Sequence, residues 1–95
     1  MFQVCDAAST GLDPRRWDRV RELAQELCES GAVPSIGIFV ARGERTTGTM
    51  LFGRQHLDDP HRTIRDDAIF LIASITKPIV AMSAMILVEN GEVRL

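Results

Sequence analysis

The stretch FLIASITKP, residues 70–78, opens the most apolar part of the chain. Between residues 68 and 88 the only charged side chain is Lys77, and an Asn-Gly pair that follows provides a helix stop. The pattern predicts a helix over residues 74–89, preceded by a short strand or extended segment over residues 69–72. A helix that is apolar nearly all round belongs in the centre of a domain, so we expect this helix to be buried.

The same apolar run is long enough to cross a bilayer, and a membrane span is the main alternative. Lys77 stands near its middle, where a charge costs about 2.5–3.5 kcal/mol on insertion. Pro78 and several Ala, Ser and Thr residues lower the apolarity further. We therefore expect no membrane span. A core that surrounds this helix needs more protein than the preceding residues comfortably supply.

An amphipathic helix is predicted earlier in the chain, over residues 14–29. Asp13 is a suitable N-cap, and Pro14 suits the first helical position, where its missing N–H costs nothing. Apolar residues recur at helical spacing along the segment, with Arg and Glu filling the other face. Gly31 ends the helix, because glycine readily adopts the left-handed conformation found after a last helical turn.

A β-hairpin is predicted between the two helices. Residues 35–41 are apolar or small on both faces, which is typical of a strand, and a second strand is expected over residues 45–53. The polar residues 55–67 contain Asp-Pro and are expected to form a loop. Residues 1–12 are expected to form a loose leader. The predicted fold class is α+β, of the α/β sandwich type: an N-terminal helix, a β-hairpin and then a buried helix.

The charge balance argues against several classes of partner. The chain has 11 basic and 13 acidic residues, a net charge of −2. It has no basic excess to neutralise a run of phosphates, so we expect no nucleic-acid partner. Residues 1–12 contain neither a basic n-region nor an apolar core, so no signal peptide is predicted. This favours the cytoplasm if Met1 is the true start.

Two groups of possible metal ligands are better explained as structural or solvated residues. Cys5 and Cys28 are far apart and do not form a CxxC pair, which predicts unpaired thiols and neither a zinc site nor a disulfide. A second group crowds the polar loop: His56, Asp58, Asp59 and His61. The Asp-Pro turn and the surrounding arginines indicate a solvated loop. We therefore expect no metal and no other cofactor.

Ser74 and Lys77 form an S-x-x-K pattern at the start of the apolar helix. Residues three apart share one face of a helix, so the Lys77 amine can reach the Ser74 hydroxyl. A serine is a weak nucleophile and needs a neighbouring base. A lysine desolvated by apolar neighbours can serve as that base, because burial disfavours its charged form. The free N–H groups at a helix N-terminus also favour an oxyanion.

The alternative is that Ser74 only caps the helix and Lys77 extends outward into solvent. The bare motif does not decide between these interpretations, because short motifs also arise by chance. The position of Lys77 favours a functional role. It is the sole lysine of the chain and lies inside its most apolar segment, where lysine rarely occurs without a purpose.

The stretch FLIASITKP also resembles the nucleophile segment of the serine beta-lactamase and penicillin-binding-protein superfamily. It is most similar to the branch of class C beta-lactamases, D-alanyl-D-alanine carboxypeptidases and related esterases, in which F-x-I-A-S-x-T-K opens the central helix. VENGEVRL, residues 88–95, is similar to the exit of that helix, and residues 33–53 are similar to the branch's first hairpin. Ala68 stands where the branch often has Thr. The resemblance covers residues 14–95.

The resemblance implies that Ser74 is the acyl-accepting nucleophile and that Lys77 helps to deprotonate it. The Ser74 backbone N–H would be one oxyanion donor. The substrate would be a small molecule with an ester or amide: a beta-lactam, a D-amino-acid peptide or a small ester. Its hydrolysis would proceed through an acyl-enzyme and need no cofactor.

Members of this family also use a later Tyr-x-Asn or Ser-x-Asn element and a Lys- or His-x-Gly triad. The chain has no Tyr and a single Lys, and both histidines precede Ser74. We therefore expect residues 13–95 to be the N-terminal portion of a beta-lactamase-related domain, incomplete by itself, after a leader at residues 1–12. The alternative is an inactive truncated fragment or relic with no catalytic activity.

Overall fold

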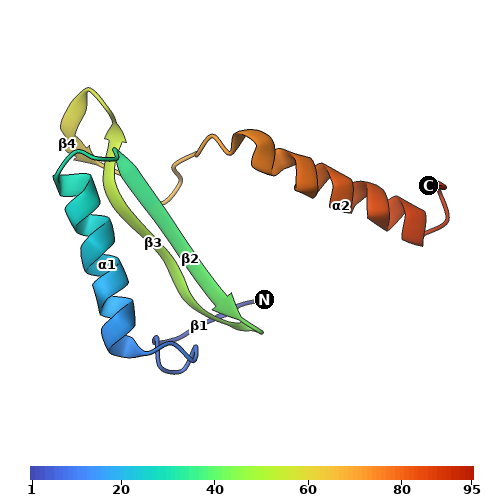
Figure 1. The fold of residues 1–95 in the computed structure, drawn as a ribbon, viewed down its shortest axis with the longest axis horizontal. Helices are drawn as coiled ribbons and strands as arrows, with labels where there is room; N and C mark the ends of the chain where they lie inside the picture. Colours follow the sequence, from blue (N-terminus) through green and yellow to red (C-terminus); the bar gives the residue numbers. More distant parts are fainter.

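The computed structural model describes residues 1–95 and contains two α-helices, a four-stranded sheet and one short 3-10 helix (Figure 1). The elements in chain order are β1 (Gln3–Val4), α1 (Pro14–Glu29), β2 (Ser35–Arg42), β3 (Arg45–His56), β4 (Asp59–Thr63), η1 (Ala73–Ile75) and α2 (Thr76–Glu89). The predicted α+β fold class is confirmed. The radius of gyration is 17.5 Å, whereas a compact chain of this length has about 12 Å.

The sheet is built on the hairpin of β2 and β3. These strands pair antiparallel, with Gly37 opposite Leu51 and Ile38 opposite Met50. Gly43 in the connecting turn has a φ of +60°, a conformation that is easy for glycine and rare for other residues. The strand order is β1-β3-β2, with β1 parallel to β3. Strand β4 pairs antiparallel with the far end of β3.

The N-terminal leader is tied to the sheet, so the prediction of a loose leader is wrong. Its backbone pairs with β3 and the preceding turn: the Gln3 N–H donates to the Glu44 carbonyl at 2.7 Å, and the Cys5 N–H to the Thr46 carbonyl at 2.9 Å. Thr10, farther along the leader, is buried. These partners lie about forty residues away in sequence, and no local sequence pattern in the leader predicts the pairing.

The region between the hairpin and the apolar helix is also more regular than predicted. Strand β3 continues to His56, and β4 occupies the middle of the segment expected to be a loop over residues 55–67. Pro60 has no N–H to donate to a neighbouring strand. It is tolerated because β4 pairs only with β3 and therefore lies at an edge of the sheet.

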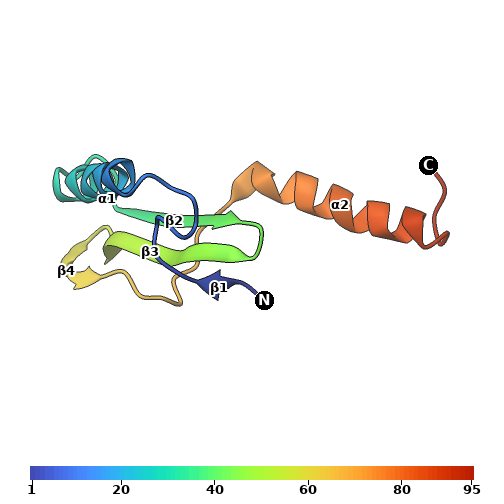
Figure 2. The ribbon, with the colours of Figure 1, turned by 90° about the horizontal axis from the view of Figure 1, so that it is seen from below.

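Helix α1 begins and ends where the sequence predicts. The Asp13 carboxylate accepts the backbone N–H of Arg16 at 3.1 Å, Pro14 is the first helical residue, and Gly31 follows the last turn with a φ of +76°. The helix packs on one face of the sheet, where Ala24 is buried. Figure 2 shows α1 on that face and no helix on the opposite one.

The apolar helix forms, but the prediction that it is buried is wrong. It begins with η1 and continues as α2, and residues 69–72 form no strand. No side chain of α2 is buried, because the helix contacts only η1 and projects away from the sheet (Figure 1). Burial requires a second packed layer, and none of the other elements supplies one. No helix in the structure is both long and apolar enough to cross a membrane.

Candidate functional site

The two residues of the S-x-x-K pattern meet where η1 runs into α2. The Lys77 Nζ donates a hydrogen bond to the Ser74 Oγ at 3.1 Å. Ser74 belongs to η1, and Lys77 lies in the first turn of α2. A separation of three residues places both side chains on one side of the helical turn. A serine hydroxyl and a lysine amine within hydrogen-bond reach are the arrangement that an activated nucleophile needs.

The surroundings of this pair differ from what the sequence predicts. Ser74 and Lys77 are both exposed. The apolar neighbours that were expected to desolvate Lys77 are themselves more than half exposed, among them Ile75, Ile79 and Val80. Desolvation requires atoms from a second packed element, and α2 has none. The pair thus has its hydrogen bond but no packed apolar wall around it.

The backbone turns sharply just before Ser74. Ala73 has a φ of +44° and is the one residue other than glycine with a positive φ. This left-handed conformation costs an alanine about 1–2 kcal/mol, and such strain is often found at functional positions. The turn sets Ser74 in the first turn of the helical segment. N–H groups there are not all used within the helix and lie at its positive end, so an oxyanion beside Ser74 would be stabilised.

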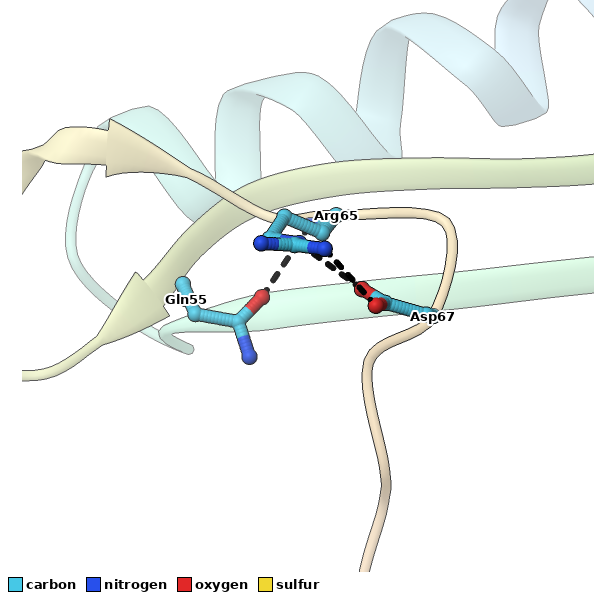
Figure 3. Close-up of polar contacts among 3 residues, drawn as sticks. All are labelled: Gln55, Arg65 and Asp67. Atoms are coloured by element: carbon cyan, nitrogen blue, oxygen red, sulfur yellow. Dashed lines mark hydrogen bonds and ion pairs between the residues drawn. The ribbon is translucent and has the colours of Figure 1, made fainter.

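A set of polar contacts, the Gln55–Arg65–Asp67 clamp, holds the start of the connector between β4 and η1 (Figure 3). The Gln55 Oε1 accepts the backbone N–H of Arg65 at 3.0 Å. The Arg65 guanidinium donates two hydrogen bonds of 2.8 Å to the Asp67 carboxylate. This paired geometry is stronger than a single hydrogen bond. The sequence did not predict the clamp, whose only local signal is the R-x-D spacing of Arg65 and Asp67.

Farther along the connector, the Phe70 ring lies against the sheet. A Cβ built on Gly37 of β2 would lie 3.7 Å from the Phe70 Cζ, so the absence of a side chain at Gly37 leaves room for the ring. After Phe70 the chain leaves the sheet and enters η1 (Figure 1). The clamp and the Phe70 contact together set the point from which the Ser74–Lys77 pair projects.

The remaining polar candidates do not gather into a site. In the loop before the connector, the Asp59 carboxylate accepts the backbone N–H of His61 at 3.1 Å. No group of three or more His, Cys, Asp or Glu side chains is placed to hold a metal ion. Cys5 and Cys28 are free, half-buried thiols. Burial raises the pKa of the Cys28 thiol, which makes it less available as a nucleophile.

The region around the Ser74–Lys77 pair also lies within a match to a known protein family. A family model described as Beta-lactamase matches residues 20–95, which is most of the chain. The match includes the β2–β3 hairpin, the connector with its clamp, and α2. A search of curated proteins found no match.

Proposed function

The chain belongs to the beta-lactamase family, and from that premise we propose that it is a serine hydrolase that forms an acyl-enzyme at Ser74. The observation that carries the proposal is the 3.1 Å hydrogen bond between the Lys77 Nζ and the Ser74 Oγ. It joins a nucleophile to a possible base at the start of a helix. The resemblance of FLIASITKP to the family's nucleophile segment supports the same assignment.

The proposed reaction has two halves. In the first, Lys77 acts as the general base and takes the Ser74 hydroxyl proton, and the serine oxygen bonds to the carbonyl carbon of the substrate. The bond from that carbon to the leaving group breaks, and the leaving group takes the proton from Lys77. In the second half, water attacks the acyl-enzyme ester, releases the acid and restores the Ser74 hydroxyl. Backbone N–H groups at the start of the helix stabilise the oxyanion in both halves.

We propose the substrate class from the resemblance to class C beta-lactamases and related esterases. It is a small molecule with a reactive carbonyl: a beta-lactam, a D-amino-acid peptide or a small ester. All three fit the same acyl transfer, because each presents a carbonyl with a leaving group on one side. Neither half of the reaction needs a metal or other cofactor for its atoms and electrons to balance.

We propose further that residues 13–95 supply the nucleophile half of a larger site. The exposed α2 helix supports this, because its apolar side chains lack a second layer. The resemblance implies a Tyr-x-Asn element and a Lys- or His-x-Gly triad, for which these residues hold no Tyr and no second Lys. Residues 13–95 by themselves would then offer only one oxyanion donor. Acylation of Ser74 in this chain should therefore be about 10²–10³ times slower than in a site that has both donors.

Covalent labelling tests the proposal. The purified chain is incubated for hours with a fluorescent penicillin or a phosphonate ester probe, and adducts are located by intact-mass and peptide mass spectrometry. Ser83→Ala is the matched control, because Ser83 is a second exposed serine in α2, whose hydroxyl donates to the Ile79 carbonyl at 3.0 Å.

Wild type and Ser83→Ala should carry one adduct, and Ser74→Ala should carry none. Equal labelling of Ser74→Ala would contradict the site assignment. No labelling of wild type by either probe would favour the alternative, a chain with the family's fold and no activity of its own.

A further inference from the structure

The connector between β4 and η1 is anchored to the sheet at two points before it reaches Ser74. At its start, the Ile64 N–H donates to the Gly53 carbonyl of β3 at 3.1 Å. Near its end, the Phe70 ring lies over Gly37 of β2. The chain therefore approaches η1 along a path that is fixed on the sheet.

Between these two points, Arg65 holds a tight turn of the connector against β3. Its backbone N–H donates to the Gln55 Oε1 at 3.0 Å (Figure 3). Its carbonyl accepts the Ala68 N–H, also at 3.0 Å. Its guanidinium makes the two 2.8 Å hydrogen bonds to the Asp67 carboxylate. The N–H, the carbonyl and the side chain of one residue thus all contribute to the shape of the connector.

The contact between Arg65 and Asp67 differs from an ordinary surface ion pair. Both side chains are mostly exposed, at 61% and 70%, and most exposed pairs contribute little to stability. A paired arginine–carboxylate contact is the exception, because the planar guanidinium fixes direction as well as distance. The pair therefore restricts the conformation of the turn more than it stabilises the fold as a whole.

The conformation of Ala73 depends on how the chain is held on either side of it. Its φ of +44° is strained for an alanine, and a strained conformation persists only where the surrounding structure imposes it. On one side η1 holds the chain, since the Ile75 N–H donates to the Ile72 carbonyl at 3.0 Å. On the other side the chain is held by the Phe70 contact and the turn at Arg65.

We propose that Arg65 is a positioning residue for Ser74. The turn at Arg65 fixes the path of the connector, the path holds Ala73 in its left-handed conformation, and Ala73 sets the angle at which Ser74 presents its hydroxyl and N–H. Arg65 makes no hydrogen bond or ion pair with Ser74 or Lys77, so it acts through the backbone. A displacement of a nucleophile by about 1 Å can slow a reaction by about 10². The predicted effect on acylation rests on the proposed function, whereas the predicted effect on Ala73 does not.

The first arm of the test measures the φ of Ala73 by NMR scalar couplings. Wild type should show a positive φ, and in Arg65→Gln the φ should move to the ordinary negative range. Arg19→Gln is the matched control, because it removes an exposed ion pair from α1, where the Arg19 guanidinium lies 3.1 Å from the Glu22 carboxylate. It should leave Ala73 unchanged. A positive φ that persists in Arg65→Gln would overturn the proposal, as would a negative φ in wild type.

The second arm measures acylation of Ser74 by the fluorescent penicillin over a range of probe concentrations. Arg65→Gln should lower the maximal rate by about 10- to 100-fold and leave the half-saturating concentration unchanged. Arg65→Lys should be equally slow, because lysine keeps the charge but lacks the planar fork. A wild-type rate in Arg65→Lys would overturn the proposal, since charge alone would then be sufficient. If wild type is not acylated, the proposed function fails and the first arm alone decides the role of Arg65.

Gln55→Met provides a second route to the same answer. It removes the acceptor of the Arg65 N–H and leaves the ion pair to Asp67 in place. Gln25→Met is its matched control, because the Gln25 Nε2 donates to the Glu29 carboxylate at 2.7 Å within α1. Gln55→Met should shift the φ of Ala73 and slow acylation, and Gln25→Met should do neither. Far-UV circular dichroism checks that every variant keeps its helices and strands. A Gln55→Met chain with an unchanged Ala73 would overturn the proposal.

Discussion

The Nζ of Lys77 lies 3.1 Å from the Oγ of Ser74 and makes no other side-chain hydrogen bond within the chain. Two exposed groups joined in this way gain little stability from their contact. Replacement of either residue should therefore leave the fold almost unchanged. A large effect on acylation would then report on chemistry and not on folding.

Lys77→Arg separates the charge of the side chain from its role as a base. Arginine keeps a positive charge and hydrogen-bond donors but does not give up its proton in proteins. We expect the rate of Ser74 acylation to fall by about 10²–10⁴, the usual contribution of a general base. Time-resolved intact-mass measurement of the adduct gives the rate. If Lys77→Arg reacts as fast as wild type, Lys77 acts only through its charge.

Ala73→Gly should stabilise the chain, because glycine adopts the φ of +44° without the clash of a Cβ. Part of the gain is lost to the greater freedom of glycine in the unfolded chain, so the net increase in the free energy of unfolding should be at most about 1 kcal/mol. The matched control is Ala81→Gly inside α2, which should destabilise the helix by about 0.5–1 kcal/mol. Urea unfolding followed by circular dichroism measures the free energy of unfolding of both variants. If both substitutions changed it in the same direction, the positive φ of Ala73 would be contradicted.

Gly53→Ala should disrupt the open end of the β2–β3 hairpin, where Gly53 pairs with Ser35. Gly53 has a φ of +93°, and a Cβ there would lie 2.8 Å from the Ser35 Cα and still closer to the Pro34 carbonyl oxygen. Both contacts are to backbone, which cannot move aside cheaply, so we expect a loss of at least about 2 kcal/mol. Gly43 also has a positive φ, but the space around it is open. Gly43→Ala should therefore lower the free energy of unfolding by only about 1–2 kcal/mol. Denaturant midpoints rank the two, and the reverse order would contradict the close backbone packing around Gly53.

Asp13→Ala should destabilise α1, because the Asp13 carboxylate accepts the Arg16 N–H at the helix start. The expected loss is about 1 kcal/mol, and Asp13→Ser should recover most of it. Asp18→Ala removes a carboxylate of the same type from the exposed side of α1, 3.6 Å from the Arg21 guanidinium. It should change the free energy of unfolding by no more than about 0.5 kcal/mol. Equal losses at both positions would argue against a capping role.

The stability of the chain should fall as the pH rises through the range in which thiols ionise. Burial raises the pKa of the Cys28 thiol in the folded state. Its stabilising contribution is therefore complete below the ordinary thiol pKa and is lost as the pH rises toward the folded value. Cys28→Ala should flatten this dependence in urea unfolding curves. An identical slope in wild type and Cys28→Ala would refute the burial effect.

Local interactions explain which features the sequence predicts correctly. The Asp13 cap, the Gly31 stop and the β2–β3 hairpin all depend on residues close to one another in the chain. The approach of Lys77 to Ser74 is of the same kind, because helical geometry alone brings residues three apart together.

The features that the sequence alone did not reveal depend on distant partners. Strand β1 forms because its backbone pairs with β3, about forty residues away in the chain. Strand β4 forms because it pairs with the far end of β3. The positive φ of Ala73 and the Gln55–Arg65–Asp67 clamp likewise arise from how the connector leaves the sheet.

The sequence by itself therefore determined helix α1, the β2–β3 hairpin, the helical form of α2, the family and the pairing of Ser74 with Lys77. Only the tertiary structure decided that α2 stands free of the sheet and that Lys77 is exposed. The physical reason is that spacing sets which side chains share a helix face, whereas burial depends on a second layer of atoms brought from elsewhere. The composition of an apolar helix indicates that the helix needs a covering layer, but it does not indicate which residues supply that layer.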